Sequence, residues 1–282
     1  AFLSSTPPFQ NAMAMDANRC GIPVVYGFCR GVGSVSYAAA VLLLGFVLER
    51  HAPTLLLPVF AALTACGLIA MSGFRLPERP DEAADRPAEH RSIAAVLRSH
   101  PRFALTLLGC MFFFLTHTIS NTYMNALVGK AGGTASAVGT SLAISAVLEL
   151  PAMTLVSRLQ KRFSPGFFLR FAAGAEVVKF LIFYLARSMP LIYLGHCMQF
   201  FQFAVYAPAT VYYVAAALPE RDQLKGQSLI YVAGSGLGGA LGNLLGGRLL
   251  DRSGIQAALL LGTVSAAASL LTFCLSTRED SR

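Results

Sequence analysis

The segment RLPERPDEAADRPAEHRSIAAVLRSHPR, residues Arg75–Arg102, decides how the rest of the chain is interpreted. It is the only long polar run, and it holds eleven of the 36 charged residues and four prolines. The segments on either side are apolar and long enough to cross a membrane, whereas a linker between soluble domains would have polar flanks. A polar, proline-rich segment between long apolar segments is typical of an aqueous loop that joins two membrane bundles. We therefore predict an N-terminal bundle over residues 1–74, a cytoplasmic central loop over 75–101 and a C-terminal six-helix bundle over 102–282.

The composition indicates an integral membrane protein. Of the 282 residues, 55% are hydrophobic and only 13% are charged, about half the charged fraction of roughly 25% that soluble domains carry. The net charge of +8 does not indicate a nucleic-acid partner, because the basic residues lie in the connections between apolar segments. The six cysteines are scattered without a CxxC or other metal-binding spacing, so we expect no metal site.

Apolar segments of membrane-spanning length occur on both sides of the loop. They lie near residues 24–48, 53–74, 103–128, 133–157, 166–187, 190–217, 226–249 and 255–276. Each has about 20 residues or more, enough to cross roughly 30 Å of hydrocarbon as a helix. Residues 1–15 resemble the end of one further helix. Because the two bundles are unequal and the chain starts without methionine, we expect further spans to precede it in a longer protein.

The basic residues in the connections predict the orientation, because Lys and Arg accumulate on the cytoplasmic side of membrane proteins. With the Arg75–Arg102 loop in the cytoplasm and the spans alternating, sixteen Lys and Arg residues lie on the cytoplasmic side and five on the other. We therefore expect a multi-pass protein of a bacterial cytoplasmic membrane, with the C-terminus in the cytoplasm.

The segment 226–249 carries four glycines at a constant spacing of four: Gly234, Gly238, Gly242 and Gly246. This spacing places one glycine on each turn of a helix, along a stripe on one face, and lets a second helix approach closely. The pattern predicts a helix-packing seam. A surface along which helices slide or rock would need the same close contact.

Glu149, Glu176 and Lys179 lie inside predicted spans, where a charge is unfavourable by a few kcal/mol and marks a functional site by default. Glu149 stands in the middle of the 133–157 segment, followed by a proline. We interpret it as a protonatable carboxylate that faces a cavity. Glu176 and Lys179 are three residues apart on one helical face, so they either form a structural ion pair or take part in proton coupling.

Neutral polar residues form stripes in two other spans. His196, Gln199 and Gln202 follow one another at spacings of three, and Asn121 belongs to a polar patch in the 103–128 segment. Such stripes suit a polar, uncharged ligand, and they suit hydrogen bonds between helices equally well. No nucleotide-binding loop, zinc-protease or nucleophile-elbow motif occurs. We therefore expect neither an enzyme nor an organic cofactor.

The segment YGFCRGVGSVSYAAA (Tyr26–Ala40), preceded by PPFQNAMAM, resembles the major facilitator superfamily at the start of its fifth helix. It is most similar to the lactose-permease type of oligosaccharide:proton symporters. GGRLLDRSG (Gly246–Gly254) and SRLQKRF (Ser157–Phe163) resemble two further turns of that family. The resemblance implies twelve spans in two six-helix halves around a central cavity. It implies an all-α integral membrane protein, N-terminally truncated, with the C-terminal six-helix half and the last two to three helices of the N-terminal half.

The resemblance also implies functions for single residues in the first half. Arg30 matches an arginine that binds sugar in that family. Tyr37 falls at the position of a tryptophan that stacks on the sugar ring. Asn11, or a neighbour, falls where the family has a glutamate paired with the arginine.

In the second half, Lys179 matches an arginine on the ninth helix, and Asn121 matches an aspartate on the seventh. On the tenth helix, Gln199 and Gln202 replace a histidine and a glutamate, and His196 replaces a lysine. The resemblance therefore implies substrate binding for the tenth-helix residues and Asn121, and a part in proton coupling for Lys179.

Glu149 lies within about one helical turn of the family's proton-linked glutamate. Because the tenth-helix carboxylate is missing, we expect Glu149 to carry the coupling proton, with Glu176 as the second candidate. The sequence thus predicts a secondary active transporter that takes up a small polar solute such as a sugar by alternating access, as a monomer in the lipid bilayer. Two alternatives stay open: efflux of amphipathic compounds, and a membrane sensor or interaction module that binds a solute without moving it.

Overall fold

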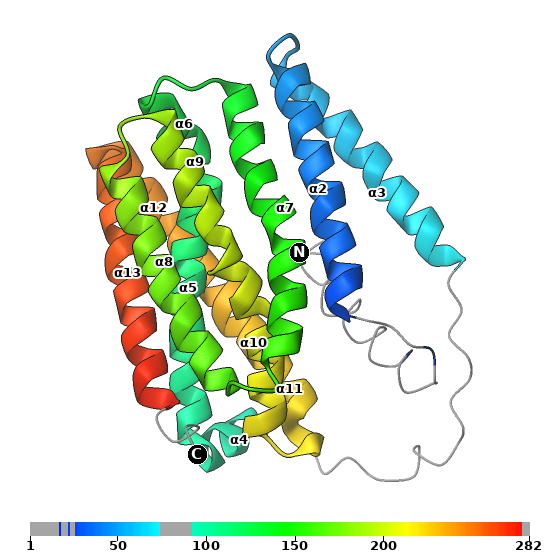
Figure 1. The fold of residues 1–282 in the computed structure, drawn as a ribbon, viewed down its shortest axis with the longest axis vertical. Coiled ribbons are helices and arrows are strands. Elements are labelled where there is room, and N and C mark those ends of the chain that lie inside the picture. The colour runs from blue at the N-terminus through cyan, green and yellow to red at the C-terminus, as the bar shows by residue number, and fades with distance from the viewer. Residues whose placement is uncertain (1–16, 18–21, 23–25, 74–91, 278–282) are drawn as a thin grey trace.

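The computed structural model describes residues 17, 22, 26–73 and 92–277, which are helices joined by short turns (Figure 1). On the N-terminal side of the undescribed segment lie α2 (Tyr26–Leu48), the short η1 (Pro53–Leu55) and α3 (Leu56–Ser72). On its C-terminal side lie α4 (Ile93–Ser99), α5 (Pro101–Thr122), α6 (Met124–Lys130), α7 (Ala135–Leu159), α8 (Pro165–Leu185), α9 (Met189–Cys197), η3 (Met198–Phe200), α10 (Phe203–Ala217), α11 (Glu220–Tyr231), the π-helix η4 (Val232–Gly238), α12 (Gly239–Ser253) and α13 (Ile255–Ser276). The expected helix over residues 1–15 and most of the predicted loop lie outside the described residues.

The helices from α4 to α13 form one bundle, and α2 and α3 stand at its edge (Figure 1). Within the bundle, α5 contacts α13, η4 and α12. Helix α2 contacts the bundle through α7, whereas α3 has no buried residue. The described residues therefore comprise a tightly packed bundle and an α2–α3 hairpin attached to it along one seam. The division at residues 74 and 102 stays a prediction.

The helices are interrupted more often than the sequence predicts. The expected span 103–128 is split at Tyr123 into α5 and α6, and the span 190–217 consists of α9, η3 and α10. The span 226–249 contains the π-helix η4, a geometry found mostly at short bulges inside helices. Five stretches are nevertheless long and apolar enough to cross a membrane: residues 101–122, 135–159, 189–217, 221–253 and 255–276. Helix α8, with 21 residues, is also long enough but carries Arg170, Glu176 and Lys179.

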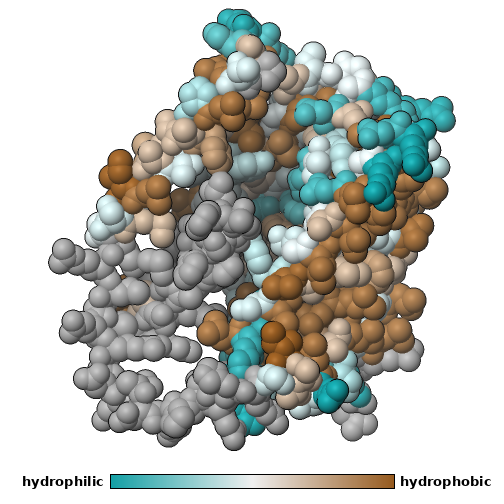
Figure 2. Space-filling view, turned by 180° about the vertical axis from the view of Figure 1, so that it is seen from behind, coloured by the Kyte–Doolittle hydropathy of each residue, from teal (hydrophilic) through white to brown (hydrophobic). Residues whose placement is uncertain are grey.

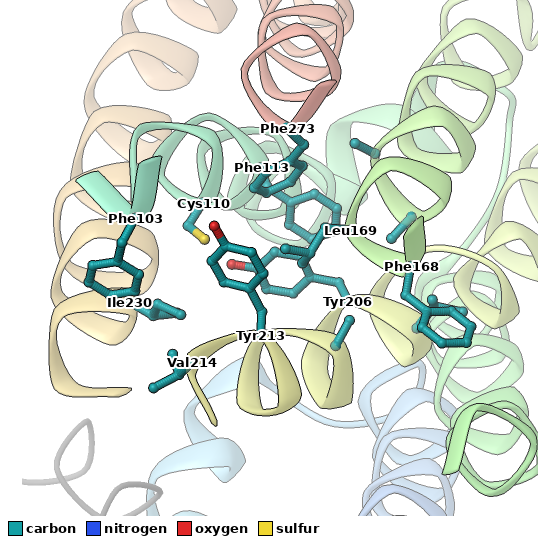
Figure 3. Packing of buried hydrophobic residues seen from close by; sticks show 14 of the residues in the cluster. Phe103, Cys110, Phe113, Phe168, Leu169, Tyr206, Tyr213, Val214, Ile230 and Phe273 are labelled. Atoms are coloured by element: carbon teal, nitrogen blue, oxygen red, sulfur yellow. The ribbon is translucent and has the colours of Figure 1, made fainter. Parts of the chain in front are cut away.

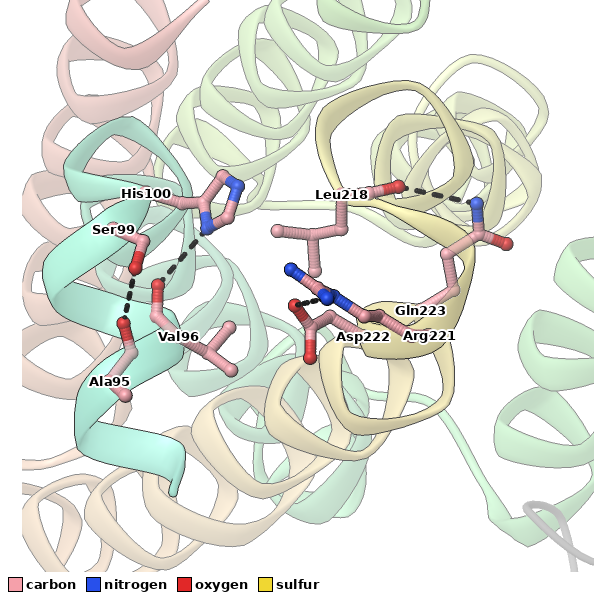
Figure 4. Close-up of polar contacts among 8 residues, drawn as sticks. All are labelled: Ala95, Val96, Ser99, His100, Leu218, Arg221, Asp222 and Gln223. Carbon is pink, nitrogen blue, oxygen red and sulfur yellow. Dashed lines mark hydrogen bonds and ion pairs between the residues drawn. The ribbon is translucent and has the colours of Figure 1, made fainter. Parts of the chain in front are cut away.

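One short helix, α4, lies inside the segment 75–101 that is predicted to be a loop. Ser92 caps it by accepting a hydrogen bond from the backbone N–H of Ala95 (3.2 Å), and Pro101 begins the next helix. The side chain of Val96 is fully buried in the core cluster of the bundle. Figure 4 shows α4 across from the start of α11, where Arg221 and Asp222 form an ion pair of 3.9 Å. The end of the loop is thus folded onto the bundle.

An aromatic core holds this end of the bundle together (Figure 3). The ring of Phe113 stacks on that of Tyr206, with centroids 3.9 Å apart, and joins α5 to α10. Phe103, Tyr213 and Phe273 are buried around this pair. In a bilayer such contacts act mainly through dispersion, because lipid tails are as apolar as the side chains.

The four regularly spaced glycines all face α5. A Cβ at Gly234 would lie 2.7 Å from the ring of Phe114, and one at Gly242 would lie 2.6 Å from the carbonyl oxygen of Leu115. At Gly238 the added atom would overlap the carbonyl of Met111, and at Gly246 it would meet the ring of Tyr123. The backbones of α5 and of the η4–α12 segment are therefore in close contact, and this contact requires glycine.

We predict that Gly238→Val destabilises the bundle by about 1–3 kcal/mol, because overpacking against a backbone group cannot be relieved by a rotamer change. The matched control is Gly236→Val, two residues away, where a Cβ would meet only one atom, at 3.9 Å. Thermal unfolding of the two purified variants in detergent measures the difference. Equal unfolding temperatures would contradict the close contact at Gly238.

Candidate functional site

The seam between α2 and α7 is an antiparallel contact of small side chains. It is lined by the buried residues Ala38, Gly45, Gly139, Ala143 and Ala146. A Cβ at Gly139 would lie 2.7 Å from the carbonyl oxygen of Val41, and one at Gly45 would lie 3.3 Å from the Cα of Gly139. The two helices therefore touch backbone to backbone, with a carboxylate at each end of the contact.

At one end, Glu49 follows the last residue of α2 and caps the start of α7. Its carboxylate accepts hydrogen bonds from Thr134 Oγ1 (2.8 Å) and from the backbone N–H of Ser136 (3.3 Å). Hydrogen bonds from the Ser136 and Thr134 side chains lower the pKa of Glu49. Because the ionised form is the one that is stabilised, this connection is intact at neutral pH and is lost only as the pH falls through the lowered pKa.

At the other end, Glu149 joins α2 to the interior of the bundle. Its half-buried carboxylate accepts a hydrogen bond from Ser34 Oγ of α2 (2.5 Å) and another from Gln199 Nε2 of η3 (3.1 Å). Gln199 Oε1 accepts in turn from Lys179 Nζ of α8 (3.1 Å). A continuous chain of hydrogen bonds thus runs from α2 through α7 and η3 to α8.

Lys179 is the cation at the centre of this site. Its side chain is only 2% exposed, and its ammonium lies 5.8 Å from the centre of the Phe183 ring. It interacts electrostatically with both Glu149 and Glu176. Glu176 itself is fully buried, and neither of its carboxylate oxygens has a hydrogen-bond partner among the described residues. Lys179 therefore bonds to Gln199 and not to the glutamate three residues before it.

Gln202 and His196 complete the buried polar groups of this region. The side chain of Gln202 interacts with the carboxylate of Glu176, and neither atom of its amide makes a well-formed hydrogen bond among the described residues. His196 Nδ1 bonds to Ser145 Oγ (2.7 Å), and its ring packs on Phe183 with a centroid distance of 5.1 Å. The other ring nitrogen of His196 is buried without a partner among the described residues.

The polar patch on α5 is organised differently. Asn121 is exposed and donates to the carbonyl oxygen of His117 (2.9 Å), with its amide 3.1 Å from His117 Nε2. The His117 ring stacks on Phe203 of α10, with centroids 4.4 Å apart. His117 and His196 both interact electrostatically with Lys179. The α5 patch therefore borders the Lys179 site without a direct hydrogen bond to it among the described groups.

The sequence-predicted site residues thus fall into three groups. Glu149 and Lys179 are both hydrogen-bonded to Gln199, and Glu176, Gln202 and His196 are buried around them. Tyr37 is half-exposed on α2 and interacts electrostatically with Glu149, while Asn121 bonds within α5. Asn11 and the side chain of Arg30 lie outside the described residues.

Three residues of the site escaped sequence reasoning. Ser34 and Ser145 bind Glu149 and His196, and Glu49 caps α7 from a different helix. Ser145 stands four residues before Glu149, so helical spacing places both on one face. Ser34 and Glu49 have no such local signal, because their partners are more than 80 residues away. No cluster of three or more His, Cys, Asp or Glu side chains suited to a metal occurs in the described part of the chain.

Comparison with known proteins identifies the family. Residues 4–261 match the model of the MFS_1 like family. The chain is 28% identical to the maltose permease of Geobacillus stearothermophilus over 257 residues, and 22% identical to the uncharacterized transporter YwbF of Bacillus subtilis (strain 168) over 258 residues. These alignments cover 90% and 91% of the chain but 64% of each relative. The chain thus spans under two thirds of the length of these relatives.

The fold is also similar to that of a solved transporter. The crystal structure of FucP, a major facilitator superfamily transporter in the outward conformation, matches with a TM-score of 0.54 and 17% identity. The match covers 82% of this chain and 59% of that one. The all-α membrane fold and the family resemblance predicted from the sequence are confirmed. The chain therefore belongs to the MFS_1-like family of the major facilitator superfamily, a superfamily of membrane transporters and not of enzymes.

Proposed function

We propose that this protein takes up a small polar solute of the sugar class together with protons, by alternating access. Its family consists of membrane transporters, and one relative is a maltose permease. Three buried polar side chains lie between the end of α9 and the start of α10, His196, Gln199 and Gln202, and they suit hydroxyl groups more than a charged ligand. Tyr37 offers a half-exposed ring for stacking.

The observation that carries the proposal is the hydrogen-bond chain from Ser34 through Glu149 and Gln199 to Lys179. It places a titratable carboxylate in the seam between α2 and the bundle, where the two halves of such a carrier would separate. A proton that binds there acts directly on the contact between the halves. Proton binding and reorientation are therefore linked through one residue.

The charges of the site favour the uptake of one proton. With both carboxylates ionised, Glu149 and Glu176 carry two negative charges against the single positive charge of Lys179. One proton on either carboxylate makes the site neutral, and neutral sites have the smallest desolvation penalty in a low-dielectric interior. We assign the coupling proton to Glu149 because this carboxylate is the one that bonds across to α2. A protonated carboxyl also loses acceptor capacity, which weakens its bond with Ser34.

Lys179 then requires another partner, and Glu176 is available. The lysine stem has four flexible carbons, and Glu176 stands three residues away on α8, where only Gln202 is a hydrogen-bonding neighbour among the described groups. In this mechanism, Lys179 compensates Glu149 when that residue is ionised and Glu176 when Glu149 is protonated. The two carboxylates thus alternate as counter-ions of one ammonium group.

The solute would occupy the region around Gln202, between the polar groups of α8 and α10. A buried amide without partners is unfavourable by about 1–3 kcal/mol, and ligand hydroxyls or water would satisfy it. The turn between α7 and α8 carries Lys161 and Arg162, which agrees with a cytoplasmic location of that end. We place the protein in the cytoplasmic membrane as a monomer, with the C-terminus inside.

We predict that Glu149→Gln abolishes accumulation of the solute against its gradient but leaves exchange across the membrane intact. The amide has the shape of the protonated carboxyl and cannot release a proton, so the carrier reorients without coupling. Uptake and counterflow in proteoliposomes measure the two activities separately. Asp251→Asn, at an exposed carboxylate of α12, is the control. Uphill uptake that survives in Glu149→Gln would contradict the assignment.

We also predict that Lys179→Met lowers stability strongly, by about 3–5 kcal/mol, because it leaves buried carboxylates without a counter-charge. Adding Glu176→Gln to this variant restores part of the loss. The exposed Lys161 provides the control, Lys161→Met. Thermal unfolding in detergent measures all three variants. A double variant no more stable than Lys179→Met would show that Glu176 is not a counter-ion of the lysine.

A further inference from the structure

A basic pocket lies at the end of the bundle opposite α4 and α11, away from the site around Lys179. It has a volume of about 550 Å³ and is lined by Lys130, Tyr184, Leu185, Arg187 and Gln256. These residues come from the end of α6, the end of α8 with the turn after it, and the start of α13. Two of the five lining residues are cations and none is acidic, so the pocket suits an anion.

Gln256 holds the parts of the pocket together. With its amide oriented to suit its neighbours, its oxygen accepts a hydrogen bond from Lys130 and its nitrogen donates to the carbonyl oxygen of Tyr184 (3.3 Å). The start of α13 is thus tied to the ends of α6 and α8. Lys130 keeps two further N–H donors for a ligand, since an ammonium group carries three.

The surroundings of the pocket are those of a membrane boundary. Leu185 is 67% exposed, and Leu181 and Val178 continue the same exposed face along α8. Tyr184 is also exposed, and tyrosine is enriched at the level of the lipid headgroups. Figure 2 shows hydrophilic side chains gathered at this end, at the upper right, directly above a broad hydrophobic band.

We propose that this pocket binds the phosphate-bearing headgroup of an anionic phospholipid, with an acyl chain along the exposed face of α8. The charge complements a phosphodiester, and the apolar stripe that begins at the pocket complements the chain attached to it. A soluble anion would use Lys130 and Arg187 but not the stripe. The lipid therefore accounts for both features.

The test uses the intact protein in neutral detergent, with lipid binding followed by native mass spectrometry. Phosphatidylglycerol is titrated, with phosphatidylcholine and glycerol phosphate as comparison ligands. We expect the Lys130→Gln/Arg187→Gln variant to bind phosphatidylglycerol about tenfold or more weakly, since each basic residue near an anionic lipid strengthens binding by a factor of about five.

Two variants keep the result interpretable. Arg248→Gln/Arg252→Gln removes the same charge from exposed arginines of α12 at the same end, and we expect it to bind like the wild type. Lys130→Arg/Arg187→Lys preserves the charge and should retain binding. If both Gln variants lost affinity for phosphatidylglycerol equally, the loss would come from the lower net charge, and the proposed site would be wrong. If millimolar glycerol phosphate displaced the lipid, or if phosphatidylcholine bound equally well, an anionic phospholipid would not be the specific ligand of the pocket.

Discussion

The site depends on one constraint: a carboxylate placed between helices in a membrane must find its hydrogen bonds within the protein. Glu149 satisfies this constraint from both sides, with Ser34 on α2 and Gln199 on η3. Gln199 also accepts from Lys179, which brings the compensating positive charge within reach. Glu149 therefore links the position of α2 to that of the buried lysine.

Close contacts between helix backbones hold the helices in the positions that these hydrogen bonds require. The glycines of η4 and α12 bring that segment against α5, and Gly45 and Gly139 bring α2 against α7. The first contact lies inside the bundle, among the aromatic side chains of α5 and α10. The second is the attachment of the α2–α3 hairpin, with Glu49 at one end and Glu149 at the other. The two seams use the same residue type, and the second has a carboxylate at each end, so we expect that seam to respond to protons.

Local sequence information predicted the helices, the glycine stripe and the membrane-embedded charges. Periodicity places residues on one face of a helix, which is why Gly234 and Gly238 were recognised as a packing surface. It does not predict breaks such as Tyr123 or η3, which depend on neighbouring helices. Spacing likewise paired Glu176 with Lys179, whereas the lysine bonds to Gln199, 20 residues away. The Ser34–Glu149 bond joins residues 115 positions apart, and only the folded chain brings them together.

In the proposed mechanism, the carboxylate of Glu149 controls the seam between α2 and α7 at the end where it bonds to Ser34. Electron paramagnetic resonance distance measurements test this directly, with spin labels at the exposed positions Val35 of α2 and Lys161 of the bundle in a variant whose native cysteines are replaced. A second pair, at Lys161 and the exposed Leu224, reports on the bundle alone. At neutral pH, we expect Glu149→Gln to shift the first distance towards a longer population and to leave the second unchanged. Identical distance distributions with Glu149 and with glutamine at that position would contradict control of the seam by this carboxylate.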